Sequence, residues 1–185
     1  MEMPARYEEL KYDLLAVAFD PQTGVLGDKT DTVLAAARTG KSASLPRMSP
    51  DGKYIALCLS ASGTFPVWHR DNDIYLLDMS DGSLLPAEEI NSDESDSYHS
   101  WSSCGRWMVF GSRRADGLYT RPYIARFDGR GKFAKPFLLP QKDPMFYQGM
   151  FKSYNIPELI TGKIATGIHT FERVAKGRAT GVRPP

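Results

Sequence analysis

The side chains that could do acid–base or nucleophilic chemistry are few and scattered along this 185-residue chain. The three histidines, His69, His99 and His169, lie far apart in the sequence. Histidine is the side chain whose ordinary pKa suits general-base work near neutral pH. A triad of His99, Ser102 and Asp96 can be written, but residues 99 and 102 of one strand point to opposite faces. We therefore expect no catalytic residue and a protein that is not an enzyme.

Motifs that hold metals, phosphates or acyl groups are also missing from the sequence. No Gly-x-Ser-x-Gly elbow, His-Glu-x-x-His zinc motif, glycine-rich phosphate loop or Cys-x-x-Cys pair occurs. The acidic run at residues 91–97 clusters the carboxylate and hydroxyl oxygens that calcium favours. The run lacks the spacing and the central glycine of a calcium loop. We interpret it as a solvated loop, and we expect neither a metal nor a cofactor.

Basic and aromatic side chains gather in two stretches that suit binding better than catalysis. One stretch surrounds Trp68, and the other runs from Arg113 to Arg121. A guanidinium beside aromatic rings can stack on and hydrogen-bond to a protein, a peptide or a glycan. The candidate binding residues are Arg47, His69, Arg70, His99, Arg113, Arg114, Tyr119 and Arg121. The alternative is that the tryptophans form the core and the arginines are merely solvated.

A repeat in the sequence indicates which elements position these residues. Residues 49–57, SPDGKYIAL, come back in altered form as residues 102–110, SSCGRWMVF, and the alignment extends without a gap to Leu45 and Tyr98. Proline, aspartate and glycine favour a tight turn, and the apolar run that follows suits a strand buried on both faces. A glycine turn before an apolar strand, repeated at this spacing, is typical of β-propeller blades.

We predict an all-β fold, a partial β-propeller of about two and a half four-stranded antiparallel blades with a short C-terminal helix and tail. The predicted units are a half blade at residues 12–40, blades at residues 45–86 and 98–140, a propeller part at residues 1–140 and a C-terminal part at residues 141–185. In the half blade, we expect one strand at residues 14–20 and the outermost strand at residues 31–37.

Helix is expected only in the C-terminal part. Asp143 followed by Pro144 favours a helix start, and apolar residues recur at helical spacing up to about Tyr154. This short helix is expected to pack on the last blade. Residues 163–185 carry an excess of basic side chains with little apolar periodicity, so we expect a disordered or loosely docked tail there.

The composition excludes several classes of protein. The 23 basic and 22 acidic side chains give a net charge of +1, which supplies no basic surface for nucleic acid. No apolar run approaches the ~20 residues of a membrane span, and the first residues lack the apolar segment of a signal peptide. Cys58 and Cys104 occupy different positions in the repeat, so we expect no disulfide between them.

The repeat resembles that of TolB-like, WD-repeat-like β-propellers. Residues 46–56 and 73–78 match the usual order, in which Trp-Ser-Pro-Asp-Gly-Lys precedes a short strand and an Asp-Ile-Tyr strand. Residues 98–103 and 113–122 are similar to uncharacterised TolB-like proteins of bacteria of the Bacteroides kind. The resemblance covers residues 14–140. It implies a binding scaffold without enzymatic activity in the periplasm or cell envelope.

The number of repeats has its own implications. Propellers close with roughly 4–8 blades, so we expect this chain to be the C-terminal part of a longer propeller, or to be completed by a second copy. Open blade edges would then favour a homodimer. The alternative function is a propeller accessory domain of a prolyl-oligopeptidase-like hydrolase, whose catalytic domain would lie outside this chain.

Overall fold

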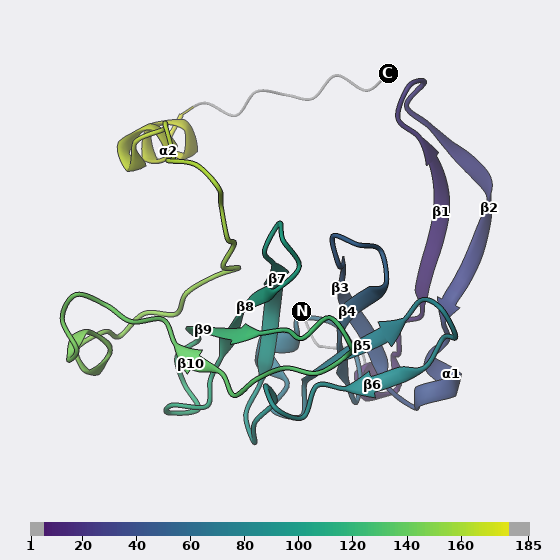
Figure 1. Cartoon of the computed structure of the whole chain (residues 1–185), viewed down its shortest axis with the longest axis horizontal. Helices are drawn as coiled ribbons and strands as arrows, with labels where there is room; N and C mark the ends of the chain where they lie inside the picture. The colour runs from purple at the N-terminus through teal and green to yellow at the C-terminus, as the bar shows by residue number, and fades with distance from the viewer. Residues whose placement is uncertain (1–5, 178–185) are drawn as a thin grey trace.

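The computed structural model describes residues 6–177 and shows an all-β fold of the partial-propeller type (Figure 1). One four-stranded antiparallel sheet contains β3 (Ser42–Met48), β4 (Tyr54–Ser60), β5 (Asp73–Asp78) and β6 (Leu84–Pro86). The other contains β7 (Asp96–Trp101), β8 (Trp107–Ser112), β9 (Arg121–Arg126) and β10 (Phe137–Leu138). A two-stranded hairpin of β1 (Leu14–Asp20) and β2 (Val25–Leu34) precedes them. In each sheet the strands follow one another in chain order, as they do in a propeller blade.

The turns at Ser49 and Ser102 share the same local hydrogen bonds. The amide of Ser49 donates to the carbonyl of Tyr54 at 2.8 Å, and the Ser49 hydroxyl accepts from the Tyr54 amide at 3.0 Å. Ser102 makes the same two bonds with Trp107 at the same two distances. Ahead of each turn, Leu45 and Tyr98 have φ angles of 50° and 51°. Residues other than glycine rarely adopt this left-handed backbone conformation. Its recurrence at equivalent positions reflects the same bulge in the first strand of each sheet.

The two sheets pack face to face, and this contact forms the main core. Alternate side chains of β4 and β5, among them Ala56, Ile74 and Leu76, bury against Met108 and Phe110 of β8. The other face of β4 is covered as well, so every residue of that strand is buried. The prediction of a strand with two buried faces is therefore confirmed for β4, and apolar burial on both sides stabilises the pair of sheets.

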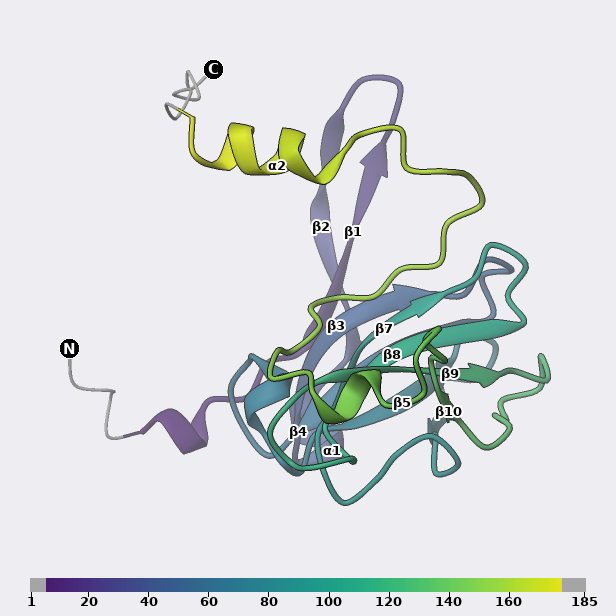
Figure 2. The same ribbon diagram turned by 90° about the vertical axis from the view of Figure 1, so that its left-hand side faces the viewer.

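The N-terminal half blade differs from the prediction. The strand expected at residues 31–37 begins earlier, at Val25, and ends at Leu34. Residues Ala36–Thr39 form a single helical turn, α1, whose first amide donates to Asp13 Oδ1 at 2.7 Å. Helix therefore also occurs before Asp143, contrary to expectation. The hairpin stands away from both sheets in the two views (Figure 1, Figure 2).

The helices of the C-terminal part also differ from the prediction. Where a helix was expected up to Tyr154, only the three-residue 3-10 turn η3 (Phe146–Gln148) forms. The chain instead forms α2 (Ile168–Ala175) within the predicted tail, and residues 178–185 of that tail lie outside the described residues. Two further 3-10 turns are η1 (Tyr7–Glu9) and η2 (Pro66–Trp68). The boundary at residue 140 stays a prediction. Within residues 6–177, no helix is long and apolar enough to cross a membrane.

Candidate binding site

A hollow at one end of the two sheets combines the features that suit a binding site. Its volume is about 310 Å³. Its walls come from η2, from the loop between β8 and β9, and from the chain near Tyr154. The lining residues are Val67, Trp68, Tyr98, Arg113, Leu118, Thr120, Ser153, Tyr154 and Asn155. Another hollow, at the opposite end around Cys104, is lined mainly by exposed residues of the repeat turns.

The first wall is the loop around η2, whose backbone carbonyls accept hydrogen bonds from other parts of the chain. Phe65 has a φ of 60°, which turns the chain into η2, and Pro66 begins that helical turn. The carbonyl of Pro66 accepts from the hydroxyl of Ser95 at 2.8 Å, and the carbonyl of Val67 accepts from the Arg113 guanidinium at 3.0 Å. Trp68, the last residue of η2, is 77 % exposed. Such a ring is ready to stack on a ligand.

Arg113 supplies the charge of the hollow. One terminal nitrogen donates to Val67, while Nε is buried and meets no acceptor within the described part of the chain. Arg113 as a whole is partly exposed, and a carboxylate is the acceptor that pairs best with a guanidinium. The guanidinium belongs to a residue that lines the hollow together with the aromatic residues Trp68, Tyr98 and Tyr154. This combination favours a ligand with a carboxylate and an apolar body.

The third wall comes from the segment that follows η3. The amide of Tyr154 donates to the carbonyl of Thr120 at 2.9 Å, and the Thr120 amide donates to Ser153 Oγ at 3.1 Å. The segment therefore lies against Thr120 as a short added strand would. Arg121 holds the chain just before it, because its guanidinium donates to the Tyr147 carbonyl at 2.6 Å and to Asp116 at 2.7 Å.

The residues predicted to bind are distributed unevenly around this hollow. Arg113 lines it, and Tyr119 lies nearby with its ring 6.3 Å from that of Phe151. His69 and Arg70 follow Trp68 on the neighbouring loop, where Arg70 pairs with Glu94 at 3.1 Å. The other predicted residues lie elsewhere or within internal contacts, namely Arg47, His99, Arg114 and Arg121. Their roles in binding stay predictions.

Several residues of the hollow had not been predicted from the sequence. Tyr98 could have been found, because it aligns with Leu45 at the bulge of the repeat. Leu118 follows the Asp116-Gly117 turn, which the sequence marks as a loop tip. Residues 153–155 carry no local signal, since only tertiary pairing with Thr120 brings them to the site.

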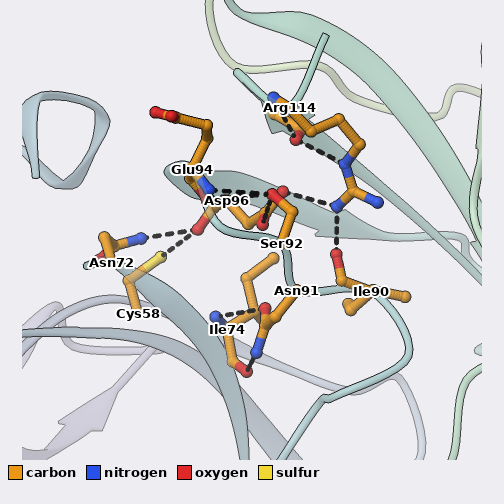
Figure 3. A network of polar contacts seen from close by, with 10 residues as sticks. Cys58, Asn72, Ile74, Ile90, Asn91, Ser92, Glu94, Asp96 and Arg114 are labelled. Carbon is orange, nitrogen blue, oxygen red and sulfur yellow. Dashed lines mark hydrogen bonds and ion pairs between the residues drawn. The ribbon is translucent and has the colours of Figure 1, made fainter. Parts of the chain in front are cut away.

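The acidic run at residues 91–97 is not the solvated loop that was predicted. Its residues 95–97 are buried, and Asp96 lies at the centre of a polar network (Figure 3). One carboxylate oxygen of Asp96 accepts from Arg114 at 2.7 Å, and the other accepts from the Ser92 hydroxyl at 2.7 Å. Asn72 donates to the Asp96 carbonyl at 2.6 Å. Across residues 6–177, no cluster of acidic, histidine or cysteine side chains could hold a metal ion.

Arg114 makes this network internal to the protein. Its guanidinium also donates to the carbonyl of Ile90 (Figure 3). A further bond from the guanidinium goes to Ser112 Oγ. The guanidinium lies over the ring of Tyr123, 4.7 Å from the ring centre. A cation with this many partners ties the loop after the first sheet to the second sheet, and it has little capacity left for a ligand.

The hypothetical triad of His99, Ser102 and Asp96 does not assemble. His99 is only 1 % exposed, and its Nδ1 faces the sulfur of Cys58 at 3.8 Å. Burial lowers the pKa of His99 to about 4, so the ring is neutral at pH 7. The Ser102 hydroxyl accepts from the Trp107 amide in the turn, and the Asp96 carboxylate accepts from Arg114.

The cysteines are free, as predicted. Cys58 is buried while Cys104 is exposed, so the two thiols lie in different environments. Burial raises the pKa of the Cys58 thiol to about 12, which leaves it protonated and unreactive.

Comparison with known proteins shows remote structural likeness. No family model matches the sequence, and no curated protein matches it either. Among solved structures, the crystal structure of TolB from Acinetobacter baumannii is similar to this chain with a TM-score of 0.45 and 23% sequence identity. The alignment covers 69% of this chain and 30% of that protein. The chain thus spans less than a third of the length of this TolB.

Proposed function

We propose that this chain is a non-enzymatic propeller module that binds an acidic peptide segment of a partner protein in the hollow around Arg113. The observation that carries the proposal is the position of Arg113, a partly exposed cationic residue that lines an open hollow beside the exposed Trp68 and Leu118. A carboxylate placed there would pair with the guanidinium and neutralise its charge.

The rest of the hollow supports a peptide as the ligand. Trp68 and Leu118 expose apolar surface that an aliphatic or aromatic side chain would cover. Ser153 and Asn155 offer polar groups at the rim for backbone amides and carbonyls. The volume of about 310 Å³ lies at the lower end of ligand sites, which suits one or two side chains rather than a large cofactor.

The cell envelope is the location that we propose for this binding. This proposed location rests on the resemblance of residues 14–140 to TolB-like repeats. Loops at one end of a rigid β-scaffold are a common place for protein recognition, which agrees with the position of the hollow.

A peptide array tests the proposal. Labelled protein is incubated with an array of random 12-residue peptides, and the best binders are titrated by calorimetry. We expect the enriched peptides to carry Asp or Glu beside an apolar residue, with Trp68→Ala and Arg113→Leu each weakening binding about tenfold or more. Trp107→Ala and Arg126→Leu are the matched controls, because both residues lie at the opposite end of the second sheet. Failure to enrich acidic peptides, or equal losses in all four variants, would contradict the proposal.

A further inference from the structure

The hairpin β1–β2 is the outer half of a blade. At its turn, the Gly24 amide donates to the carbonyl of Asp20 at 2.8 Å, and the Gln22 amide donates to Asp20 Oδ1 at 2.9 Å. The β5–β6 turn repeats this, with the Gly82 amide bonded to the Asp78 carbonyl at 2.9 Å and Asp78 Oδ1 accepting at 2.8 Å. Equal turns with equal local bonds make Asp20 the equivalent of Asp78.

The strand registers agree with this equivalence. Phe19 lies opposite Leu26 in the hairpin, and Leu77 lies opposite Leu84 in the first sheet. Each pair directly precedes and follows its turn at the same spacing. Strand β1 is therefore the counterpart of β5, and β2 is the counterpart of β6.

The two equivalent strands differ in what lies on their other edge. Strand β5 pairs with β4 on that edge, and Leu77 is 2 % exposed. Strand β1 pairs with β2 alone within the described ranges, and its Leu15, Val17 and Phe19 are 53 %, 43 % and 59 % exposed. Free edges are usually blocked by charged residues or proline, and residues 14–19 contain neither.

The base of the hairpin packs on the first sheet. At the base of the hairpin, Leu14 and Leu34 pack in the cluster that contains Ile55 and Leu57 of β4. From there the apolar positions of β1 run outward into solvent, along the projecting part of the hairpin (Figure 2). The hairpin is thus joined to the first sheet at its base, and its outer part stays uncovered within the described residues.

We propose that the free edge of β1 binds an antiparallel strand pair of blade type from another polypeptide segment. The pair would lie as β3 and β4 lie on β5, with a polar strand, a Ser-Pro-Asp-Gly type of turn and an apolar strand against β1.

An extended chain tests this proposal. A copy of residues 41–60 is placed directly before Met1, so that residues 1–13 take the connecting role that residues 61–72 have between β4 and β5. We expect the melting temperature to rise and amide exchange in β1 to slow by about tenfold or more. The control carries Ile55→Ser and Leu57→Ser in the added copy only, and it should give neither effect.

Two results would overturn the proposal. The first is an extended chain whose β1 amides exchange as fast as those of the control. The second is strong protection of β1 in the unextended chain that increases with protein concentration, because a second copy would then be the occupant. Val17→Lys in the extended chain checks the site of docking, since a charge on β1 should remove the added protection there while β8 stays protected.

Discussion

At the scale of single residues, Arg114 and Asp96 fasten the loop after the first sheet to the second sheet. Asp96 is fully buried, and its carboxylate receives one bond from Arg114 and one from Ser92. Arg114→Leu would leave this carboxylate buried without its cation, so we expect a loss of about 3–5 kcal/mol in unfolding free energy. Urea denaturation measures this loss. Arg106→Leu, at an exposed arginine, should change the stability by less than about 0.5 kcal/mol.

The double variant Asp96→Asn with Arg114→Leu distinguishes the buried charge from lost packing. It should recover part of the stability that Arg114→Leu loses, because the uncompensated charge is gone. A loss below about 1 kcal/mol for Arg114→Leu alone would show that the network of Figure 3 does not form in solution.

His99 makes stability depend on pH. Its folded pKa of about 4 lies below the ordinary value of 6.5, so the unfolded chain takes up the proton first. Unfolding free energy should therefore fall as pH drops from 6.5 to 4, by at most about 1.4 kcal/mol per pH unit. Thermal melting of His99→Gln should show this slope removed, while the more exposed His69→Gln retains it. An unchanged slope in His99→Gln would mean that His99 is not buried as described.

The residues of the hollow were only partly predictable from the sequence. Trp68 and Arg113 belong to short basic and aromatic stretches, which the sequence displays directly. The sequence does not indicate that the guanidinium of Arg113 bonds to Val67, whereas that of the neighbouring Arg114 turns inward to Asp96. Adjacent residues of a strand point to opposite faces, so one of the two arginines is expected to turn inward. Which one does so depends on the residue at which β8 ends.

At the scale of elements, the repeat turns set the strand register. The hydroxyls of Ser49 and Ser102 each accept the amide that starts the following strand, at 3.0 Å. Ser49→Ala and Ser102→Ala should each lower the unfolding free energy by about 1 kcal/mol, because a buried amide loses its acceptor. Chemical denaturation of the two variants measures it. Ser103→Ala, at the exposed position beside Ser102, should be nearly neutral; unequal effects of Ser49 and Ser102 would contradict their equivalence.

Strands were predicted better than helices for a physical reason. The strands of the two sheets lie between turn residues whose chemistry is local, so Gly52 and Gly105 mark them in the sequence. The helix expected after Asp143 has a start signal, but its apolar side chains, such as Phe151, remain exposed and supply little packing to stabilise it. Helix α2 instead has an ion pair between Glu172 and Lys176 at 2.6 Å within a segment that reads as a basic tail.

At the scale of the whole molecule, two complete blades and half of a third differ in how well they are covered. The two sheets bury their shared face, and β4 is buried on both sides. The hairpin β1–β2 pairs along one edge and packs only at its base. Both the hollow around Arg113 and the free edge of β1 depend on this arrangement. The hollow forms where the two sheets pack together, and the edge of β1 is free because the half blade is open.

Hydrogen–deuterium exchange of the unmodified chain, followed by mass spectrometry, tests this arrangement most directly. We expect the slowest exchange in the central strands β4, β5, β8 and β9, whose amides are bonded within buried sheets. Exchange in β1 and β2 should be faster by about a hundredfold or more, because the hairpin can open without disturbing the core. Protection of β1 equal to that of β4 at every protein concentration, or rapid exchange throughout β8 and β9, would contradict two complete blades with an open half blade.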